Sequence, residues 1–124
     1  MTDTSEFKLG KTSGEESADR LVVDLKRRNP AGISLDLWEL YDLGCSLPFN
    51  PGPPSSIRKA TASVQLNYGR GFDCGFMETI HELLKVDVPT DPDEIELARR
   101  KFITKKYGFQ FNGEKPIKEA ALCH

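Results

Sequence analysis

The chain has 124 residues, of which 38% are apolar and 29% charged, and its formal net charge is −2. This length predicts a single domain with a real core, and the small net charge excludes a global field that would attract nucleic acid or an anionic membrane. No stretch approaches the roughly 18 consecutive apolar residues that read as a membrane span.

The compartment follows from the N-terminus and the cysteines. The first residues are polar and lack the apolar run of a signal peptide. The three cysteines are widely spaced and odd in number, which makes a poor disulfide framework. We therefore expect an intracellular, cytoplasmic protein.

Residues 1–18 are rich in Ser, Thr, Gly, Glu and Lys, with Phe7 and Leu9 as their bulky apolar residues. Such a segment offers little apolar surface to offset its ordering entropy, so it is predicted to be a flexible N-terminal tail. A short binding motif around Phe7 and Leu9 is the alternative. The globular domain is expected over residues 19–113, followed by a C-terminal tail over 114–124.

Residues 20–28 fit two structures. Asp19 is a possible helix cap, whereas Val22 and Val23 favour a short strand equally well. The choice between helix and strand stays open from the sequence.

Residues 35–43 are predicted to form a helix, because Ser34 suits an N-cap and Gly44 a C-terminal stop. The segment is apolar on more than one side and its charged residues are all acidic. We expect its aromatic residues to lie in the core. The alternative is a protein-binding surface, because tryptophan and tyrosine dominate interface energetics. The candidate protein-binding residues are Trp38, Glu39, Tyr41 and Asp42.

Four prolines between residues 45 and 56 predict a connecting loop, and residues 58–68 after it predict a strand. In this strand the apolar residues alternate with polar ones. The strand partners are expected at 21–25 and 109–111. Because these are few, the exposed strand edge predicts a homodimer or larger oligomer.

Residues 69–75 are predicted to be a glycine-rich turn before a helix at 76–85. The glycine spacing matches neither the dinucleotide nor the P-loop pattern. Cys74 is then a candidate reactive thiol, since a helix N-terminus lowers a thiol pKa. His81 is two turns away, beyond the reach of a catalytic base, so a buried unreactive thiol is expected.

The possible metal ligands lack the close pairing of structural zinc sites, and no metal or cofactor is predicted. They are Cys45, Cys74, His81, Cys123 and His124.

Residues 92–107 give the strongest helix prediction. Asp91 is the expected cap, Pro92 suits the first helical position, and Gly108 suits the stop. Basic residues gather toward its C-terminal end and form the candidate nucleic-acid surface: Arg99, Arg100, Lys101, Lys105 and Lys106. A helical projection spreads these residues around the helix, which is typical of a solvated face.

Together these patterns predict a small α+β domain with about three helices packed on a small, mainly antiparallel sheet. The favoured function is a non-enzymatic accessory or adaptor protein that acts through protein contacts and self-association. The alternative is a nucleic-acid-binding protein that uses the basic end of helix 92–107. A cysteine-dependent enzyme is the third possibility.

Overall fold

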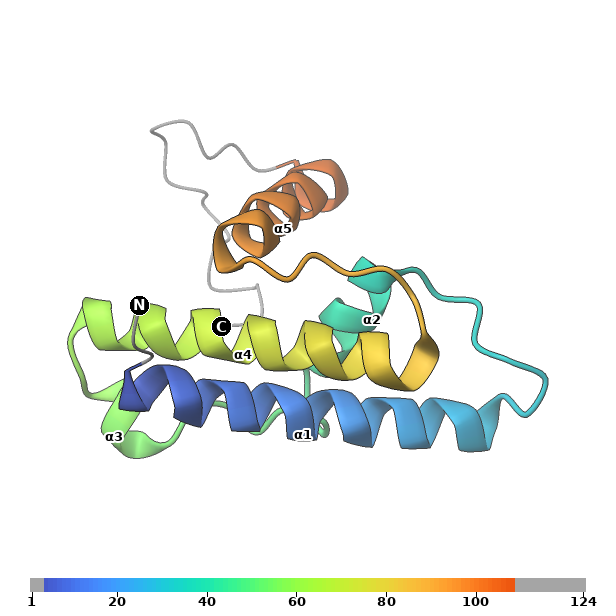
Figure 1. Cartoon of the computed structure of the whole chain (residues 1–124), viewed down its shortest axis with the longest axis horizontal. Coiled ribbons are helices and arrows are strands. Elements are labelled where there is room, and N and C mark those ends of the chain that lie inside the picture. Colours follow the sequence, from blue (N-terminus) through green and yellow to red (C-terminus); the bar gives the residue numbers. More distant parts are fainter. Residues whose placement is uncertain (1–3, 109–124) are drawn as a thin grey trace.

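The computed structural model describes residues 4–108 of the chain. Within this range the secondary structure is entirely helical. The helices in chain order are α1 (Ser5–Arg28), α2 (Leu37–Gly44), α3 (Ser55–Arg58), α4 (Ala62–Leu84) and α5 (Pro92–Tyr107). Figure 1 shows α1 and α4 side by side along the length of the molecule, with α5 placed obliquely on the side of α4 away from α1.

The two long helices run parallel and touch through their backbones. A Cβ on Gly10 would meet the backbone of Tyr68, and a Cβ on Gly14 would meet that of Phe72. Contact positions therefore increase together along both helices. Parallel helices require a long connection, which residues 29–61 supply with α2, α3 and the proline-rich loop.

Glycines on α4 complete this contact from the other side. A Cβ on Gly75 would lie 2.9 Å from the carbonyl carbon of Lys11 and closer still to its oxygen, and Gly71 meets Phe7 in the same way. Each helix thus carries two glycines one turn apart, which lets the backbones approach as they do in other pairs with small residues at the interface.

The core extends from this contact toward the C-terminal halves of α1 and α4. Its fully buried side chains come from four helices: Leu21, Val22, Leu40, Phe76, Met77, Ile80 and Ile95. α2 is tied to α1 by a buried hydrogen bond in which Ser17 Oγ donates to the Gly44 carbonyl at 2.5 Å. The α2 backbone is close-packed here, because a Cβ on Gly44 would overlap the Phe76 ring.

The helices predicted near 35–43 and 92–107 are both present, but α2 begins at Leu37 and its N-cap is Asp36, not the expected Ser34. α2 begins at a capping box formed by Asp36 and Glu39. α5 has Asp91 as its N-cap and Gly108 in the left-handed conformation at its C-terminus. The predictions for helices near 35–43 and 92–107 are confirmed.

The α+β prediction is wrong, because residues 4–108 contain no sheet. The predicted strand at 58–68, the glycine turn at 69–75 and the helix at 76–85 are largely one helix, α4. Thr61 caps this helix by accepting a hydrogen bond from the Val64 N–H. The alternating pattern contains Ala, Gln and Asn, which are weak strand formers. Packing against α1 then stabilises the helical conformation of this segment.

The expected N-terminal tail is also wrong, because α1 begins at Ser5 and is continuous through residues 20–28. Its early half carries little apolar surface, yet Gly10 and Gly14 are buried against α4. The strand partner expected at 109–111 and the C-terminal tail at 114–124 lie outside the described residues. The unpaired strand behind the oligomer prediction does not exist in residues 58–68, so self-association stays an untested prediction.

Candidate functional site

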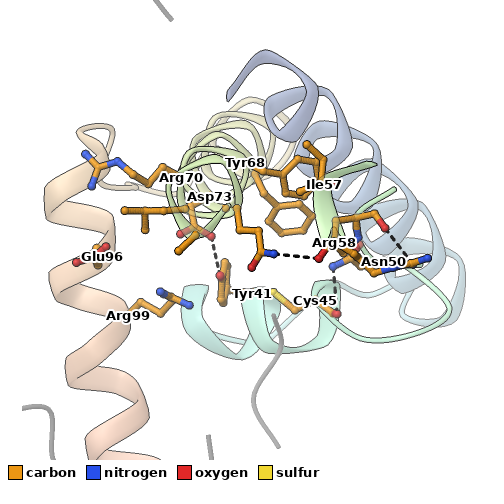
Figure 2. A pocket seen from close by; sticks show the side chains of 16 residues that line it. Tyr41, Cys45, Asn50, Ile57, Arg58, Tyr68, Arg70, Asp73, Glu96 and Arg99 are labelled. Atoms are coloured by element: carbon orange, nitrogen blue, oxygen red, sulfur yellow. Dashed lines mark hydrogen bonds between the residues drawn. The ribbon is translucent and has the colours of Figure 1, made fainter. Parts of the chain in front are cut away.

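An open cleft of about 740 Å³ lies between α4 and α2, with α5 at one end and α3 with the proline-rich loop at the other. Its lining combines apolar side chains, three arginines and two carboxylates. Figure 2 shows Arg99 reaching in from α5 and Arg58 lying at the opposite end. A concave site with an apolar lining and a few converging polar groups is the usual form of a binding site.

One face of α4 forms the floor of the cleft. Six of the eight α4 residues that line the cleft recur at the three- and four-residue spacing of a single helix face: Ala62, Gln65, Leu66, Gly69, Arg70 and Asp73. The other two, Tyr68 and Phe72, lie toward the face that contacts α1. The glycines that contact α1 lie on a different face of the same helix. α4 therefore serves two purposes, with one face closing against α1 and another presented to the cleft.

Asp73 is the most unusual residue of this floor. It is 8% exposed, and its Oδ1 accepts a hydrogen bond from Tyr41 Oη at 2.6 Å. Burial raises the pKa of this carboxyl to about 6, although Arg99, the Tyr41 hydroxyl and Arg70 favour the charged form. Glu96 acts in the same direction as burial. A carboxyl group with a raised pKa in a cleft marks a candidate functional site.

Two ion pairs hold α5 over the cleft. Arg70 Nη2 lies 2.8 Å from Asp93 Oδ1 near the start of α5, and Lys106 Nζ lies 2.6 Å from Asp42 Oδ2 near its end. Both pairs are partly exposed, so each contributes little stability. The buried side chains of Ile95 and Ile103 anchor α5 against the other helices, and the two ion pairs add to this packing on the side of the cleft that Arg99 lines.

The opposite end of the cleft is built by α3. The exposed Arg58 donates from Nη1 to the Pro53 carbonyl at 3.2 Å, which holds its guanidinium at the mouth. Gln65 on α4 donates to the Arg58 carbonyl at 3.0 Å and thereby links α3 to the floor. This end is thus a basic rim beside the apolar Ile57.

The predicted protein-binding residues of α2 are used within the fold. Trp38 is half-buried, with its ring centroid 6.1 Å from that of Phe102 on α5. Tyr41 is buried and bonded to Asp73. Glu39 completes the α2 capping box and Asp42 pairs with Lys106. Of these four residues, Tyr41 alone lines the cleft.

Replacing Trp38 by alanine should lower the free energy of unfolding by about 3 kcal/mol, the low end of the range for truncating a packed aromatic residue. The loss follows from its contacts with Phe102 and with Tyr41, whose ring centroid is 5.4 Å away. Thermal unfolding followed by circular dichroism measures this change. Glu82→Ala, an exposed position on α4, serves as the control, and an unmoved melting temperature in Trp38→Ala would show that α2 and α5 do not pack.

The candidate nucleic-acid residues do not form one surface. Arg99 faces the cleft, Arg100 pairs with Glu96 at 3.1 Å, and Lys106 pairs with Asp42. Lys101 and Lys105 are exposed. The five side chains point in different directions and two of them are tied by ion pairs, so the arrangement does not favour a phosphate-binding stripe.

Cys74 does not lie at a helix start. It is in the middle of α4 and 5% exposed, and burial raises the pKa of its thiol to about 11. The prediction that a helix N-terminus lowers this pKa is wrong, because α4 begins at Ala62. Among residues 4–108, no group of three or more His, Cys, Asp or Glu side chains is placed to hold a metal ion. Cys123 and His124 lie outside this range.

Several residues of the cleft were missed by sequence reasoning, namely Arg58, Gly69, Arg70 and Asp73. The predicted turn at 69–75 separates Gly69, Arg70 and Asp73 from Ala62 and Leu66, although all five lie on one face of α4. A helical projection of residues 62–73 would have placed them together.

Comparison of the chain with known protein families, curated proteins and solved structures gave no match. Within the described part of the chain, every helix is too short or too polar to cross a membrane.

Proposed function

We propose that the protein is a non-enzymatic binding module that engages a partner protein through the cleft. The observation that carries this proposal is Gly69. It lies in the interior of α4, where glycine costs about 1 kcal/mol relative to alanine, yet a Cβ at this position would have no atom within 4 Å. Packing therefore gives no reason for glycine here, whereas the cleft does: the missing side chain leaves the floor open to a ligand.

The surroundings of Gly69 fit a peptide ligand. Leu66, one turn before it, is 54% exposed although it is a large apolar residue in the cleft. Peptide-binding grooves combine such apolar anchoring surface with polar groups at the rim. The chemistry at hand supports binding over catalysis, because Asp73 is already engaged by Tyr41 and the Cys74 thiol is buried.

Filling the floor with Gly69→Leu should abolish binding while the protein stays folded. The new side chain enters open space and improves helix propensity, so the melting temperature should stay level or rise. The measurement is a selection of random peptides on the immobilised wild-type protein, followed by binding of each enriched peptide to both proteins. We expect peptides that bind the wild type and bind Gly69→Leu at least tenfold more weakly.

Ser63→Leu is the matched control, because it adds the same side chain to an exposed position of α4 outside the cleft. It should leave binding unchanged. Enriched peptides that bind Gly69→Leu as well as the wild type, or a selection that enriches none, would overturn the proposal.

A further inference from the structure

The C-terminal end of α5 lies beside the wall of the cleft. Lys106 Nζ contacts Asp42 Oδ2 at 2.6 Å, and Asp42 is next in the chain to Tyr41, which lines the cleft from α2. Gly108 ends α5 two residues after Lys106, in the left-handed conformation that turns the chain away from the helix axis. The C-terminal segment, residues 109–124, therefore starts close to the α2 wall.

The C-terminal segment is long enough to reach the middle of the cleft. Gly108 follows the lining residue Arg99 by nine residues of helix, a distance of about 13 Å. An extended chain covers this distance in about four residues. Ile117 and Leu122 come nine and fourteen residues after Gly108, so both have enough chain to return to the floor at Gly69.

The floor offers the apolar surface that these two side chains would cover. Leu66 is 54% exposed, and a Cβ on Gly69 would have no atom within 4 Å. Ile57 adds an apolar wall to the same cleft. Covering Leu66 and the bare backbone removes apolar surface from water, which is the main driving force for such a contact.

Charge does not oppose this contact. At the α5 end of the cleft, Arg70 pairs with Asp93 at 2.8 Å, and Glu96 pairs with Arg100 at 3.1 Å. The C-terminal segment carries two glutamates and two lysines, so these charges also balance. Apolar character is therefore the property in which the cleft and the segment match.

We infer that the C-terminal segment binds the floor of the cleft in its own chain, with Ile117 and Leu122 over Leu66 and Gly69, and so competes with the partner protein. This inference rests on the proposed function, because it adds a competitor to the same site. A segment linked to its site by a short stretch of chain has an effective concentration on the order of millimolar. A contact too weak to form between separate molecules therefore occupies the cleft for part of the time, and a partner that binds more tightly displaces it.

Ile117→Ser combined with Leu122→Ser in the full-length protein should strengthen peptide binding. The probes are the peptides enriched on the wild-type protein, and fluorescence anisotropy measures their affinity. Removing the competitor should raise this affinity about fivefold, as expected if the segment covers the cleft for about four fifths of the time.

Lys118→Ser combined with Glu119→Ser is the matched control, because it changes two residues of the same segment and keeps the net charge. It should change the affinity less than twofold. An unchanged affinity in the Ile117→Ser, Leu122→Ser protein would overturn the inference, and so would an equal gain in the control.

A nitroxide label on Cys123 tests the contact without any peptide. Cys45 and Cys74 are buried, so the label is directed to Cys123, and a Cys123→Ser protein taken through the same reaction is the control. Nuclear magnetic resonance should show broadened amide signals for Leu66 and Gly69 in the labelled protein alone.

The outcomes separate this inference from the proposed function. If these signals stay sharp while the enriched peptides lose affinity for Gly69→Leu, the inference is wrong and the proposed function stands. If the signals broaden but no peptide is enriched, the segment is the occupant of the cleft and the proposed function is wrong. Broadening between labelled and unlabelled molecules in a mixture would place the segment of a second copy in the cleft and overturn the inference.

Discussion

Replacing Gly14 by alanine should lower the free energy of unfolding by about 3 kcal/mol, although alanine is the better helix former. The added Cβ would lie 2.9 Å from the Phe72 carbonyl carbon and the same distance from the Phe76 nitrogen. These are backbone atoms inside helix α4, so no side-chain rotation relieves the overlap. The two helices must move apart, which weakens the apolar contacts between their C-terminal halves as well.

Thermal unfolding followed by circular dichroism measures this loss. For a chain of this size, about 3 kcal/mol corresponds to a melting temperature lower by roughly 12 °C. The control is Gly69→Ala, which makes the same chemical change on α4 where a Cβ meets nothing within 4 Å. It should raise the free energy of unfolding by about 1 kcal/mol through helix propensity.

A second variant tests whether the overlap comes from this particular contact. Gly75→Ala acts from the α4 side against the Lys11 backbone and should cost about as much as Gly14→Ala. The double variant should cost less than the sum, because helices already separated by one methyl group have more room for the next. Additive losses, or a Gly14→Ala protein as stable as the wild type, would contradict the direct backbone contact of α1 and α4.

The parts of this fold that the sequence predicts are those with local causes. Helix α5 has its cap, its first-turn proline and its stop within 18 consecutive residues, Asp91 to Gly108. Each of these residues acts on the adjacent turn of the helix, so its effect does not depend on the tertiary structure around it. The aromatic helix α2 also has a local cap, although this cap is Asp36 and not the expected Ser34.

Helix α4 was mispredicted because its glycines depend on a helix far away in the sequence. Taken alone, Gly69, Gly71 and Gly75 indicate a turn. Gly71 and Gly75 become helical because α1 offers Gly10 and Gly14 at the same four-residue spacing. The matching spacing of the two glycine pairs is the signal that could have revealed both the helix and its partner.

The cleft could not be read from the sequence because it joins distant segments. Tyr41 and Asp73 are 32 positions apart, and their hydrogen bond exists only when α2 packs against α4. Arg99 was identified as a basic residue, but its direction depends on how α5 sits on the other helices. The sequence shows which residues are charged or aromatic, but it does not show that these side chains meet in one cleft.

The buried Asp73 should make the stability of the protein depend on pH between about 4 and 6. Burial raises the pKa of this carboxyl from 3.8 to about 6, so the folded state holds its proton more tightly than the unfolded state does. The stabilising contribution is therefore fully present below pH 3.8 and is lost as pH rises through 6. Two pH units correspond to about 3 kcal/mol.

Replacing Asp73 by asparagine removes this ionisation and keeps an oxygen that can accept the Tyr41 hydroxyl. Asp73→Asn should equal the wild type near pH 4 and exceed its free energy of unfolding at pH 7 to 8, by up to about 3 kcal/mol. Urea unfolding of both proteins across this pH range measures the difference. Taking the difference between the two proteins removes the pH dependence that comes from titrating groups present in both. Asp24, whose pKa is lowered by Arg27 and Arg28, is one such group.

Tyr41→Phe is the companion variant, since it removes the hydrogen bond that favours the charged carboxylate. Its loss of stability should be larger at pH 7 than at pH 4, the opposite trend to Asp73→Asn. An Asp73→Asn protein less stable than the wild type at pH 7 would show that Arg99 and Arg70 outweigh burial and hold Asp73 as a net stabilising charge. A gain at pH 7 would mean that the chain keeps a destabilising carboxylate on the floor of its cleft, which favours a role for this position in binding over a role in folding.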